Sequence, residues 1–517
     1  MYPGTHARTT PEKAAVVVAE TGDVLTYAAL DERSTRLARV LREAGLRAGD
    51  HVAVVSDNRP EVFEVYWAAL RSGLYVTAVN AHLSADEAAY VVQDCGARVL
   101  AASAAVADLA VAVAGRVPGL ELRLGFGGDV PGFDAYADAL AATSAEPLGD
   151  QPCGADMLYS SGTTGRPKGV QPALPQRQVD EPGDTIAAVF GPLYGFGPDT
   201  VYYSPAPVYH AAPLRFGGMV HRFGGTLVLA QRFDAEAALA HLERYRVTHA
   251  QFVPTMFVRM LKLPPEVRAA ADVSSLRVAV HAAAPCPVEV KRQMMAWWGP
   301  VLHEYYSSTE ANGVTLIGPE EWLRRPGSVG RAGLGVIHVC DDDGEELPPG
   351  EVGTVWFERD EMPFAYHGDP DRTAEAQHPR HPTWSTVGDV GRVDDEGYLF
   401  LTDRKAFMVI SGGTNVYPQE VEDVLTLHPA VHDVAVIGVP DPDMGEVVKA
   451  VVQLPEGVEG GPTLERELIA FVRSRIAHYK APRSVDFVDE LPRTPTGKLQ
   501  KHRLRARYAT TTGPATG

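Results

Sequence analysis

Apolar runs alternate with helical segments along much of the chain. Residues 27–45 carry leucines at the spacing of one helical face, and His51-Val52-Ala53-Val54-Val55 follows as a continuous apolar run typical of a buried strand. The same order returns with an apolar run at 227–229, a helical stretch at 235–244 and another apolar run at 251–253. This alternation is typical of layered α/β domains. The sequence therefore predicts an α/β fold.

The pattern changes near residue 326. From Gly327 to Arg404 the chain has short strand-like runs separated by turn dipeptides, which predicts a small antiparallel sheet or barrel. Within it, residues 341–343 are three aspartates without the spacing of a calcium loop, so we expect a solvated hairpin turn. Beyond Arg404 we expect mixed α/β structure, and after Tyr508 a disordered tail. At 517 residues, the chain is too long for a single core, which predicts several structural units.

Composition limits the partners of the chain. A formal net charge of −19 disfavours a surface that coats nucleic acid, so a phosphate site must be a local cationic pocket for a small anion. Cys95, Cys153, Cys286 and Cys340 lie far apart, which indicates neither a zinc site nor a disulfide framework. The amino terminus lacks a signal-peptide pattern, and charges interrupt the Ala/Val-rich stretch 100–117. We therefore expect a cytoplasmic protein with no membrane span and no nucleic-acid partner.

Residues 160–169 have the composition of a loop that holds a polyphosphate. Their glycines allow backbone N–H groups to turn toward anionic oxygens, the hydroxyls add donors, and Lys168 adds a mobile positive charge. A Walker A loop is excluded because Gly169 stands where Ser or Thr is required. The alternative is a flexible surface loop without a ligand. The candidate nucleotide-binding residues are Ser160, Ser161, Gly162, Thr163, Thr164, Gly165 and Lys168.

A second segment, 305–310, follows an expected strand at 301–303. In this segment Glu310 can hold Mg²⁺, Thr309 can donate a hydrogen bond to a phosphate oxygen, and a tyrosine can stack on a purine. Taken alone, Ser-Ser-Thr-Glu is equally a helix-start signal. The candidates here are Tyr305, Tyr306, Ser307, Ser308, Thr309 and Glu310.

Two further segments lie toward the carboxyl terminus. Asp389 can accept hydrogen bonds from both ribose hydroxyls, and Arg404 supplies a fixed fork of donors. A glycine-containing loop follows, with the candidates Ser411, Gly412 and Gly413. The last segment, 492–499, presents Lys498 on a loop, and a single lysine of this kind is by itself an ordinary surface residue.

Together and in this order, the four segments resemble the motifs of the adenylate-forming superfamily, which includes acyl-CoA synthetases, peptide-synthetase adenylation domains and beetle luciferases. The resemblance covers nearly the whole chain. It implies a large N-terminal domain, 1–403, of two α/β sheet subdomains plus a small β-barrel-like unit. A hinge at 404–406 and a small mobile α+β C-terminal domain, 407–517, complete the implied fold. The form of 411–418 is similar to the loop that lines the pantetheine path in acyl-CoA synthetases.

The resemblance also implies a role for each matching residue. Lys498 matches the lysine of the adenylation step, and His210 matches the residue beside the acyl pocket. The remaining matches place 160–168 on the ATP phosphates, Thr309 on a phosphate, Glu310 on Mg²⁺, Tyr306 against adenine, and Asp389 and Arg404 on the ribose.

The chain departs from the resembled pattern at four places. Val387 precedes Gly388-Asp389 where threonine is usual, and Ser307 stands where glycine is common. Ala406 occupies the hinge position, where Asp or Lys is usual. A Gly-Gly-Ala-Pro segment is replaced by Ala282-Ala283-Ala284-Pro285, which is expected to narrow the nucleotide or acyl pocket slightly, and Ala283 is the candidate cofactor-binding residue of this segment.

The resemblance implies an ATP-dependent acyl-CoA synthetase that uses Mg²⁺ and coenzyme A and releases AMP and pyrophosphate. Small side chains in 210–218 and 253–255 favour a bulky, polycyclic terpenoid- or steroid-like acid over a linear fatty acid. Three alternatives stay open: a free-standing ligase that loads a carrier-protein pantetheine, an oxygenase of the luciferase type, and a catalytically silent nucleotide-binding protein. A homodimer is also left open.

Overall fold

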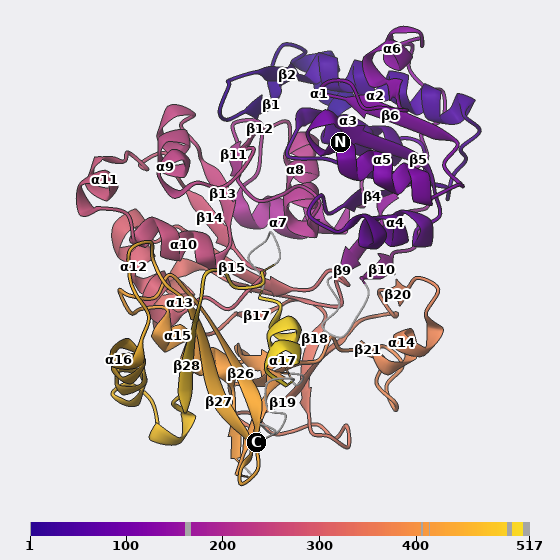
Figure 1. Ribbon diagram of the computed structural model, residues 1–517. Helices are drawn as coiled ribbons and strands as arrows, with labels where there is room; N and C mark the ends of the chain where they lie inside the picture. The colour runs from indigo at the N-terminus through magenta and orange to yellow at the C-terminus, as the bar shows by residue number, and fades with distance from the viewer. Residues whose placement is uncertain (1, 161–166, 405–406, 413, 494–498, 510–517) are drawn as a thin grey trace. The chain divides into compact units, whose positions relative to one another are not determined.

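The computed structural model describes residues 2–160, 167–404, 407–412, 414–493 and 499–509. Helices and strands alternate along much of the chain, which confirms the predicted α/β fold (Figure 1). The chain forms two compact units. The first unit consists of residues 1–252, 263–280 and 363–373, and the second of 253–262, 281–362 and 374–517. The predicted division at a hinge, 404–406, stays a prediction.

A parallel sheet of six strands forms one layer of the first unit, in the order β7-β6-β5-β3-β4-β8. All five residues of β3 and of β4 are buried, because helices cover both faces of such a sheet. On one side, α4 (Ala85–Asp94) and α5 (Ala107–Arg116) share its core. The strands are β3 (His51–Val55), β4 (Tyr75–Val79), β5 (Ala97–Ser103), β6 (Leu122–Phe126), β7 (Asp134–Ala135) and β8 (Ala155–Asp156).

A second group of strands in the first unit has the order β13-β11-β12-β1-β2. It confirms the apolar runs predicted near 227–229 and 251–253 as strands and 235–244 as a helix, α9 (Ala235–Arg244). The strands are β1 (Ala14–Val18), β2 (Val24–Thr26), β11 (Val201–Ser204), β12 (Thr226–Leu229) and β13 (His249–Phe252). The larger helices of this unit are α2 (Tyr27–Glu43), α3 (Pro60–Leu70), α7 (Thr185–Tyr194) and α8 (Ala211–Phe223).

The second unit contains the antiparallel sheet predicted between Gly327 and Arg404. Its order is β18-β19-β22-β23, and β21 also pairs with β19. The predicted turn at 341–343 lies directly after β18. The strands are β18 (Val336–Cys340), β19 (Gly353–Glu358), β21 (Trp384–Ser385), β22 (Asp389–Val393) and β23 (Leu399–Arg404).

Further strands and helices of the second unit precede that sheet along the chain. An antiparallel set consists of β15 (Leu302–Ser307), β16 (Val314–Ile317) and β17 (Arg331–Leu334). The helices are α10 (Pro254–Leu261), α12 (Val288–Trp298) and α13 (Pro319–Arg324), and β14 (Val278–His281) leads from the first unit into the second. Short helices elsewhere in the chain are α1 (Pro3–Thr9), α6 (Tyr136–Ala141), α11 (Pro265–Ala270) and α14 (Pro370–Glu375).

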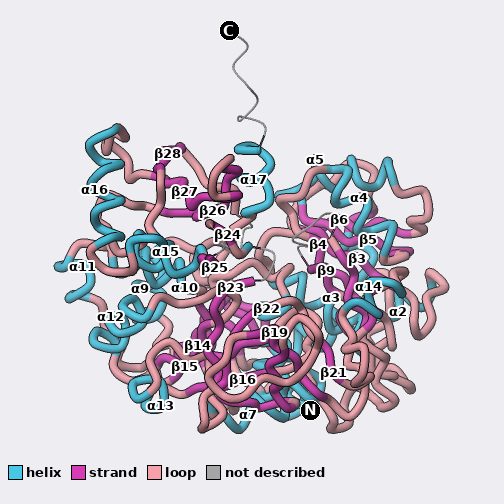
Figure 2. Tube along the Cα trace, turned by 90° about the horizontal axis from the view of Figure 1, so that it is seen from below, coloured by secondary structure: helices cyan, strands magenta, loops and turns pink. Residues whose placement is uncertain are grey.

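After Arg404 the chain is mixed α/β, as predicted. Strands β26, β27 and β28 lie side by side, and α15, α16 and α17 pack against them (Figure 1). The view from below shows α16 beside β28 (Figure 2). The elements are β24 (Val409–Ser411), β25 (Thr414–Val416), α15 (Pro418–Leu425), β26 (Asp433–Asp441), β27 (Gly445–Gln453), α16 (Pro462–Arg473), β28 (Ser484–Val488) and α17 (Lys501–Ala509). The tail predicted to be disordered lies mostly outside the described residues.

None of the described helices has the length and apolarity that a bilayer-spanning segment requires.

Candidate active site

The first unit carries the base of the predicted phosphate loop on a hairpin. Strand β9 (Leu158–Ser160) pairs antiparallel with β10 (Lys168–Gln171), so that Ser160 and Lys168 are register partners. Lys168 therefore begins a strand, whereas the sequence pattern placed it in a loop. The predicted residues Ser161, Gly162, Thr163, Thr164 and Gly165 lie outside the described residues, and so does the side chain of Ser160.

A third strand, β20 (Ala365–Tyr366), supports this hairpin. Tyr366 pairs with Val170, and the ammonium group of Lys168 lies 5.3 Å from the centroid of the Tyr366 ring. The backbone N–H of His367 donates to the carbonyl of Gly169 over 2.9 Å. A cation over a tyrosine ring is attracted by its quadrupole, so Tyr366 restricts where Lys168 points. The sequence reasoning missed Tyr366, because only the strand pairing brings it to the hairpin.

His210 occupies the N-cap position of α8, and its ring lies 4.5 Å from that of Tyr209. Two small residues of the same helix have a packing role. A Cβ atom on Gly217 would lie 2.5 Å from the ring of Phe63, and one on Gly218 would lie 2.8 Å from that of Tyr66. These glycines therefore allow α8 to approach α3 closely, and they do not indicate a wide acyl pocket.

In the second unit, Tyr305, Tyr306 and Ser307 lie within β15, not in a loop. The backbone of Tyr306 pairs with Thr315 of β16, which extends the strand beyond the predicted residues 301–303. Thr309 and Glu310 follow in the turn between the two strands. No helix begins at this described segment, so the helix-start alternative is wrong.

This turn has an unusual backbone. The N–H of Ala311 donates to the carbonyl of Ser308 over 3.1 Å, and Ala311 has a φ of 51°. A non-glycine residue in the left-handed region costs about 1–2 kcal/mol, so other contacts must hold the turn. The side chain of Asn312 is one such contact, because its Oδ1 accepts from the hydroxyl of Ser308 at 2.9 Å and its Nδ2 donates to the carbonyl of Ser385 at 3.4 Å.

The candidate adenine and ribose residues are in direct contact. The hydroxyl of Tyr306 donates to Oδ2 of Asp389 over 2.6 Å, and the side chain of Asp389 is buried. Asp389 begins β22 and is the register partner of Arg404 at the end of β23. The side chain of Arg404 lies outside the described part of the chain. The fold thus brings together Tyr306, Asp389 and the backbone of Arg404.

Ala283 follows β14 with a φ of 75°, in the left-handed region that favours glycine. A buried ion pair joins α12 to β15, in which Nζ of Lys291 is 2.5 Å from Oε2 of Glu304. Burial raises the pKa of Glu304, and the ammonium of Lys291 offsets part of that effect. His281 is fully buried 3.5 Å from the same carboxylate, and burial lowers its pKa well below the usual value. The imidazole is therefore neutral.

Ser411 ends β24, and Gly412 follows with a φ of 55°. The N–H of Gly412 donates to the carbonyl of Met444 over 2.9 Å, and a Cβ atom there would lie 2.5 Å from Cε of Met444. The positive φ favours glycine at this position, whereas the flexible end of the Met444 side chain could move away from a Cβ atom. The predicted residues Gly413 and Lys498 lie outside the described residues.

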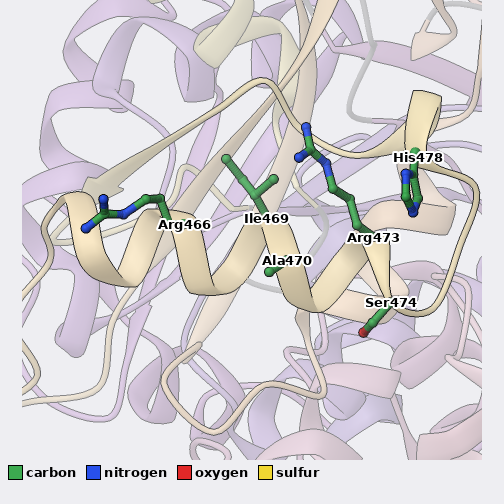
Figure 3. Close-up of a pocket in the computed structure, with 6 residues that line it drawn as sticks. All are labelled: Arg466, Ile469, Ala470, Arg473, Ser474 and His478. Carbon is green, nitrogen blue, oxygen red and sulfur yellow. The ribbon is translucent and has the colours of Figure 1, made fainter.

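An exposed groove of about 490 Å³ lies on α16. Figure 3 shows Arg466, Ile469 and Arg473 on the same side of the helix, with His478 on the short helix that follows. Ala470 and Ser474 complete the lining. No sequence-predicted site residue is among these six residues.

No group of three or more His, Cys, Asp or Glu side chains that could hold a metal ion occurs among the described residues. Mg²⁺ that is bound to a nucleotide takes one or two protein carboxylates and completes its shell with phosphate oxygens and water. Glu310 is the carboxylate that the sequence predicts for it.

Comparison with known proteins gives two family matches. The family described as AMP-binding enzyme matches residues 4–366, and the AMP-binding enzyme C-terminal domain matches residues 420–498. Among solved structures, ATP-bound MatB from Rhodopseudomonas palustris superimposes with a TM-score of 0.81 at 30% identity, covering 99% of this chain and 100% of that chain. This similarity confirms the predicted fold class.

Curated relatives are similar over almost their whole length. A feruloyl-CoA synthase from Amycolatopsis sp is 36% identical, with 98% of both chains covered. The long-chain-fatty-acid–CoA ligase FadD13 of Mycobacterium tuberculosis is 32% identical, with 98% of this chain and 97% of the relative covered. A 7a-methyl-1,5-dioxo-octahydro-indenyl-propanoyl:CoA ligase from Rhodococcus jostii is 32% identical, with 94% of both chains covered.

Proposed function

Since the chain belongs to the family of AMP-binding enzymes and is an AMP-forming acid–thiol ligase, we propose that it converts a hydrophobic, ring-bearing carboxylic acid to its CoA thioester. The observation that carries the assignment of the nucleotide site is the contact between Tyr306 and Asp389. This contact joins an aromatic ring and a buried carboxylate within one unit. An aromatic ring can stack on a purine, and a carboxylate can accept hydrogen bonds from the ribose hydroxyls.

The proposed reaction has two half-reactions. In the first, a carboxylate oxygen of the acid bonds to the α-phosphorus of ATP, the bond to the bridging oxygen breaks, and pyrophosphate leaves with the electron pair. In the second, the CoA thiol gives its proton to solvent, its sulfur bonds to the acyl carbon, the bond between that carbon and the phosphate oxygen breaks, and AMP leaves with the electron pair. Because two anions meet in the first step, positioning and charge neutralisation carry most of the catalysis.

Several residues of the chain supply these effects in the proposal. Lys168 and the hydroxyls of the 160–164 segment bind the phosphates, Asp389 and Arg404 bind the ribose, and Lys498 neutralises charge between the carboxylate and the α-phosphate. Mg²⁺, when bound at Glu310 with Thr309 beside it, would neutralise charge on the phosphate oxygens. Gly412 and Gly413 line the pantetheine path, and His210 lies beside the acid.

A ring-bearing acid is supported by the printed names of two relatives, which are a feruloyl and a bicyclic propanoyl ligase. Because another relative is a long-chain-fatty-acid–CoA ligase, linear fatty acids are the competing class of substrate. A panel of ferulic acid, a bicyclic propanoic acid and palmitic acid, scored by AMP release with and without CoA, separates these classes. AMP release that depends on a carrier protein instead of CoA would indicate the alternative acceptor.

The roles of the two lysines can be tested separately. We expect Lys498→Ala to abolish most pyrophosphate release while preserving transfer from preformed acyl-adenylate to CoA, because the bridging charge acts only in the first step. Tyr366→Leu should raise the KM for ATP several-fold through Lys168, whereas Tyr366→Phe should not, since it keeps the aromatic face. Equal losses in both half-reactions of Lys498→Ala, measured in single-turnover assays, would contradict the assigned role.

A cytoplasmic location and a homodimer belong to the same proposal. The four cysteines are free thiols, which supports a reducing compartment. Sedimentation of the purified protein would test the dimer.

A further inference from the structure

We propose that Thr386 is a positioning residue for Asp389, and that its hydroxyl holds the turn from which the carboxylate is presented to the ribose of the nucleotide. This inference rests on the proposed function, in which Asp389 binds the ribose. No motif of the sequence pointed to Thr386, and its contacts come only from the tertiary structure.

The hydroxyl of Thr386 makes two hydrogen bonds to backbone. It donates to the carbonyl of Val355 in β19 over 2.7 Å, and it accepts from the N–H of Gly388 at 3.1 Å. The N–H of Thr386 itself donates to the carbonyl of Ala376 over 2.9 Å. One side chain thus ties the turn before Asp389 to a central strand of the antiparallel sheet.

The turn needs the support of Thr386 because the neighbouring residues, on either side of Thr386, do not hold it. Gly388 has a φ of 81°, and no atom lies within 4 Å of the position that its Cβ would occupy. The glycine therefore supplies backbone freedom and no packing. Val387 has no hydroxyl. The Oγ of fully buried Ser385 has no hydrogen-bond partner among the described residues.

Asp389 is consequently held from two directions. Thr386 fixes the backbone that leads into it, and the hydroxyl of Tyr306 fixes Oδ2 of its carboxylate at 2.6 Å. A carboxylate that binds two ribose hydroxyls must keep its orientation, because small misplacements weaken both hydrogen bonds together. Loss of the Thr386 hydroxyl should therefore weaken recognition of the ribose more than binding of the phosphates.

The test compares equilibrium binding of Mg-ATP and Mg-2′-deoxy-ATP by calorimetry, without any acid, so that no turnover occurs. Thr386→Val removes the hydroxyl at nearly constant shape, and Thr386→Ser keeps it. Ser385→Ala is the matched control, since it removes an adjacent buried hydroxyl that makes no hydrogen bond within the described part of the chain. Asp389→Asn is the positive control for ribose recognition. Should the valine variant fail to fold, Thr386→Ala makes the same comparison.

We expect Thr386→Val to reduce the preference for ATP over 2′-deoxy-ATP about five- to tenfold, as for the loss of a hydrogen bond that orients a charged group. Thr386→Ser and Ser385→Ala should keep the preference within about twofold. If Asp389→Asn loses the preference and both Thr386→Val and Thr386→Ala keep it, the role of Thr386 is wrong while the proposed function stands. If the unsubstituted protein binds neither nucleotide, the proposed function is wrong.

Discussion

Tyr306 and Asp389 are 83 residues apart in the chain, and the hydroxyl of the first lies 2.6 Å from the carboxylate of the second. A hydrogen bond to a charged group contributes about 1.5–3 kcal/mol, so we predict that Tyr306→Phe weakens ATP binding about tenfold or more. The aromatic face is kept, and only the link to Asp389 is lost. Calorimetric titration with Mg-ATP measures the change.

Tyr398→Phe is the matched control for this prediction. The hydroxyl of Tyr398 donates to Oε1 of Glu321 over 3.0 Å in the same unit, so its removal deletes an equivalent tyrosine–carboxylate bond away from the candidate residues. ATP affinity should not change in this variant. Equal losses of affinity in both variants would show that Tyr306 acts through general stability alone.

Ala283 is predicted to be a strained position. Its φ of 75° is costly for alanine and free for glycine, so Ala283→Gly should stabilise the protein by about 0.5–1 kcal/mol after the extra chain entropy of glycine is included. Ala284 does not have a positive φ, and Ala284→Gly should therefore destabilise by about 0.5–1 kcal/mol. Urea unfolding followed by tryptophan fluorescence compares the two. A loss of stability in both would refute the strain.

The buried pair Lys291–Glu304 should respond differently to single and double substitution. Lys291→Met leaves a buried carboxylate without its cation and should cost about 3–5 kcal/mol, whereas Lys291→Met with Glu304→Leu should recover most of that loss. Arg116→Met, which breaks an exposed pair with Asp86, should cost less than about 1 kcal/mol. Additive losses in the double variant would contradict the prediction.

Stability should fall in mild acid because of His221. Trp67 Nε1 donates to His221 Nδ1 over 3.2 Å, and His221 Nε2 lies 3.2 Å from the carbonyl of Ala15, so the buried ring is neutral with its proton on Nε2. Burial lowers the pKa of His221 from 6.5 to about 3. Since the unfolded chain takes up the proton first, this contribution is fully present above pH 6.5 and is lost as the pH falls toward 3.

Between pH 7 and pH 5 the loss from His221 should be about 2 kcal/mol. The stability difference between the unsubstituted protein and His221→Asn should shrink by that amount, since the variant has no group to titrate. Urea unfolding at both pH values measures it. Parallel pH profiles of the two proteins would rule out His221 as a source of the acid sensitivity.

Local patterns in the sequence were sufficient for many elements of the fold. The apolar run 51–55 is β3 and the helical stretch 235–244 is α9, because a buried strand and an amphipathic helix each carry their own periodicity. The extent of β15 was not predicted. Tyr305, Tyr306 and Ser307 belong to it because they pair with β16, and pairing with a partner strand is not encoded within the segment itself.

The identity of the candidate residues came from the sequence, since the chemistry of Glu310 and Asp389 is a property of their side chains and of the motifs around them. Their supports came only from the tertiary structure. Tyr366 reaches Lys168 through strand pairing, and Thr386 reaches Val355 and Gly388 through the antiparallel sheet. Such contacts join segments that are distant in the chain, and their geometry depends on how the whole unit packs, which no local pattern records.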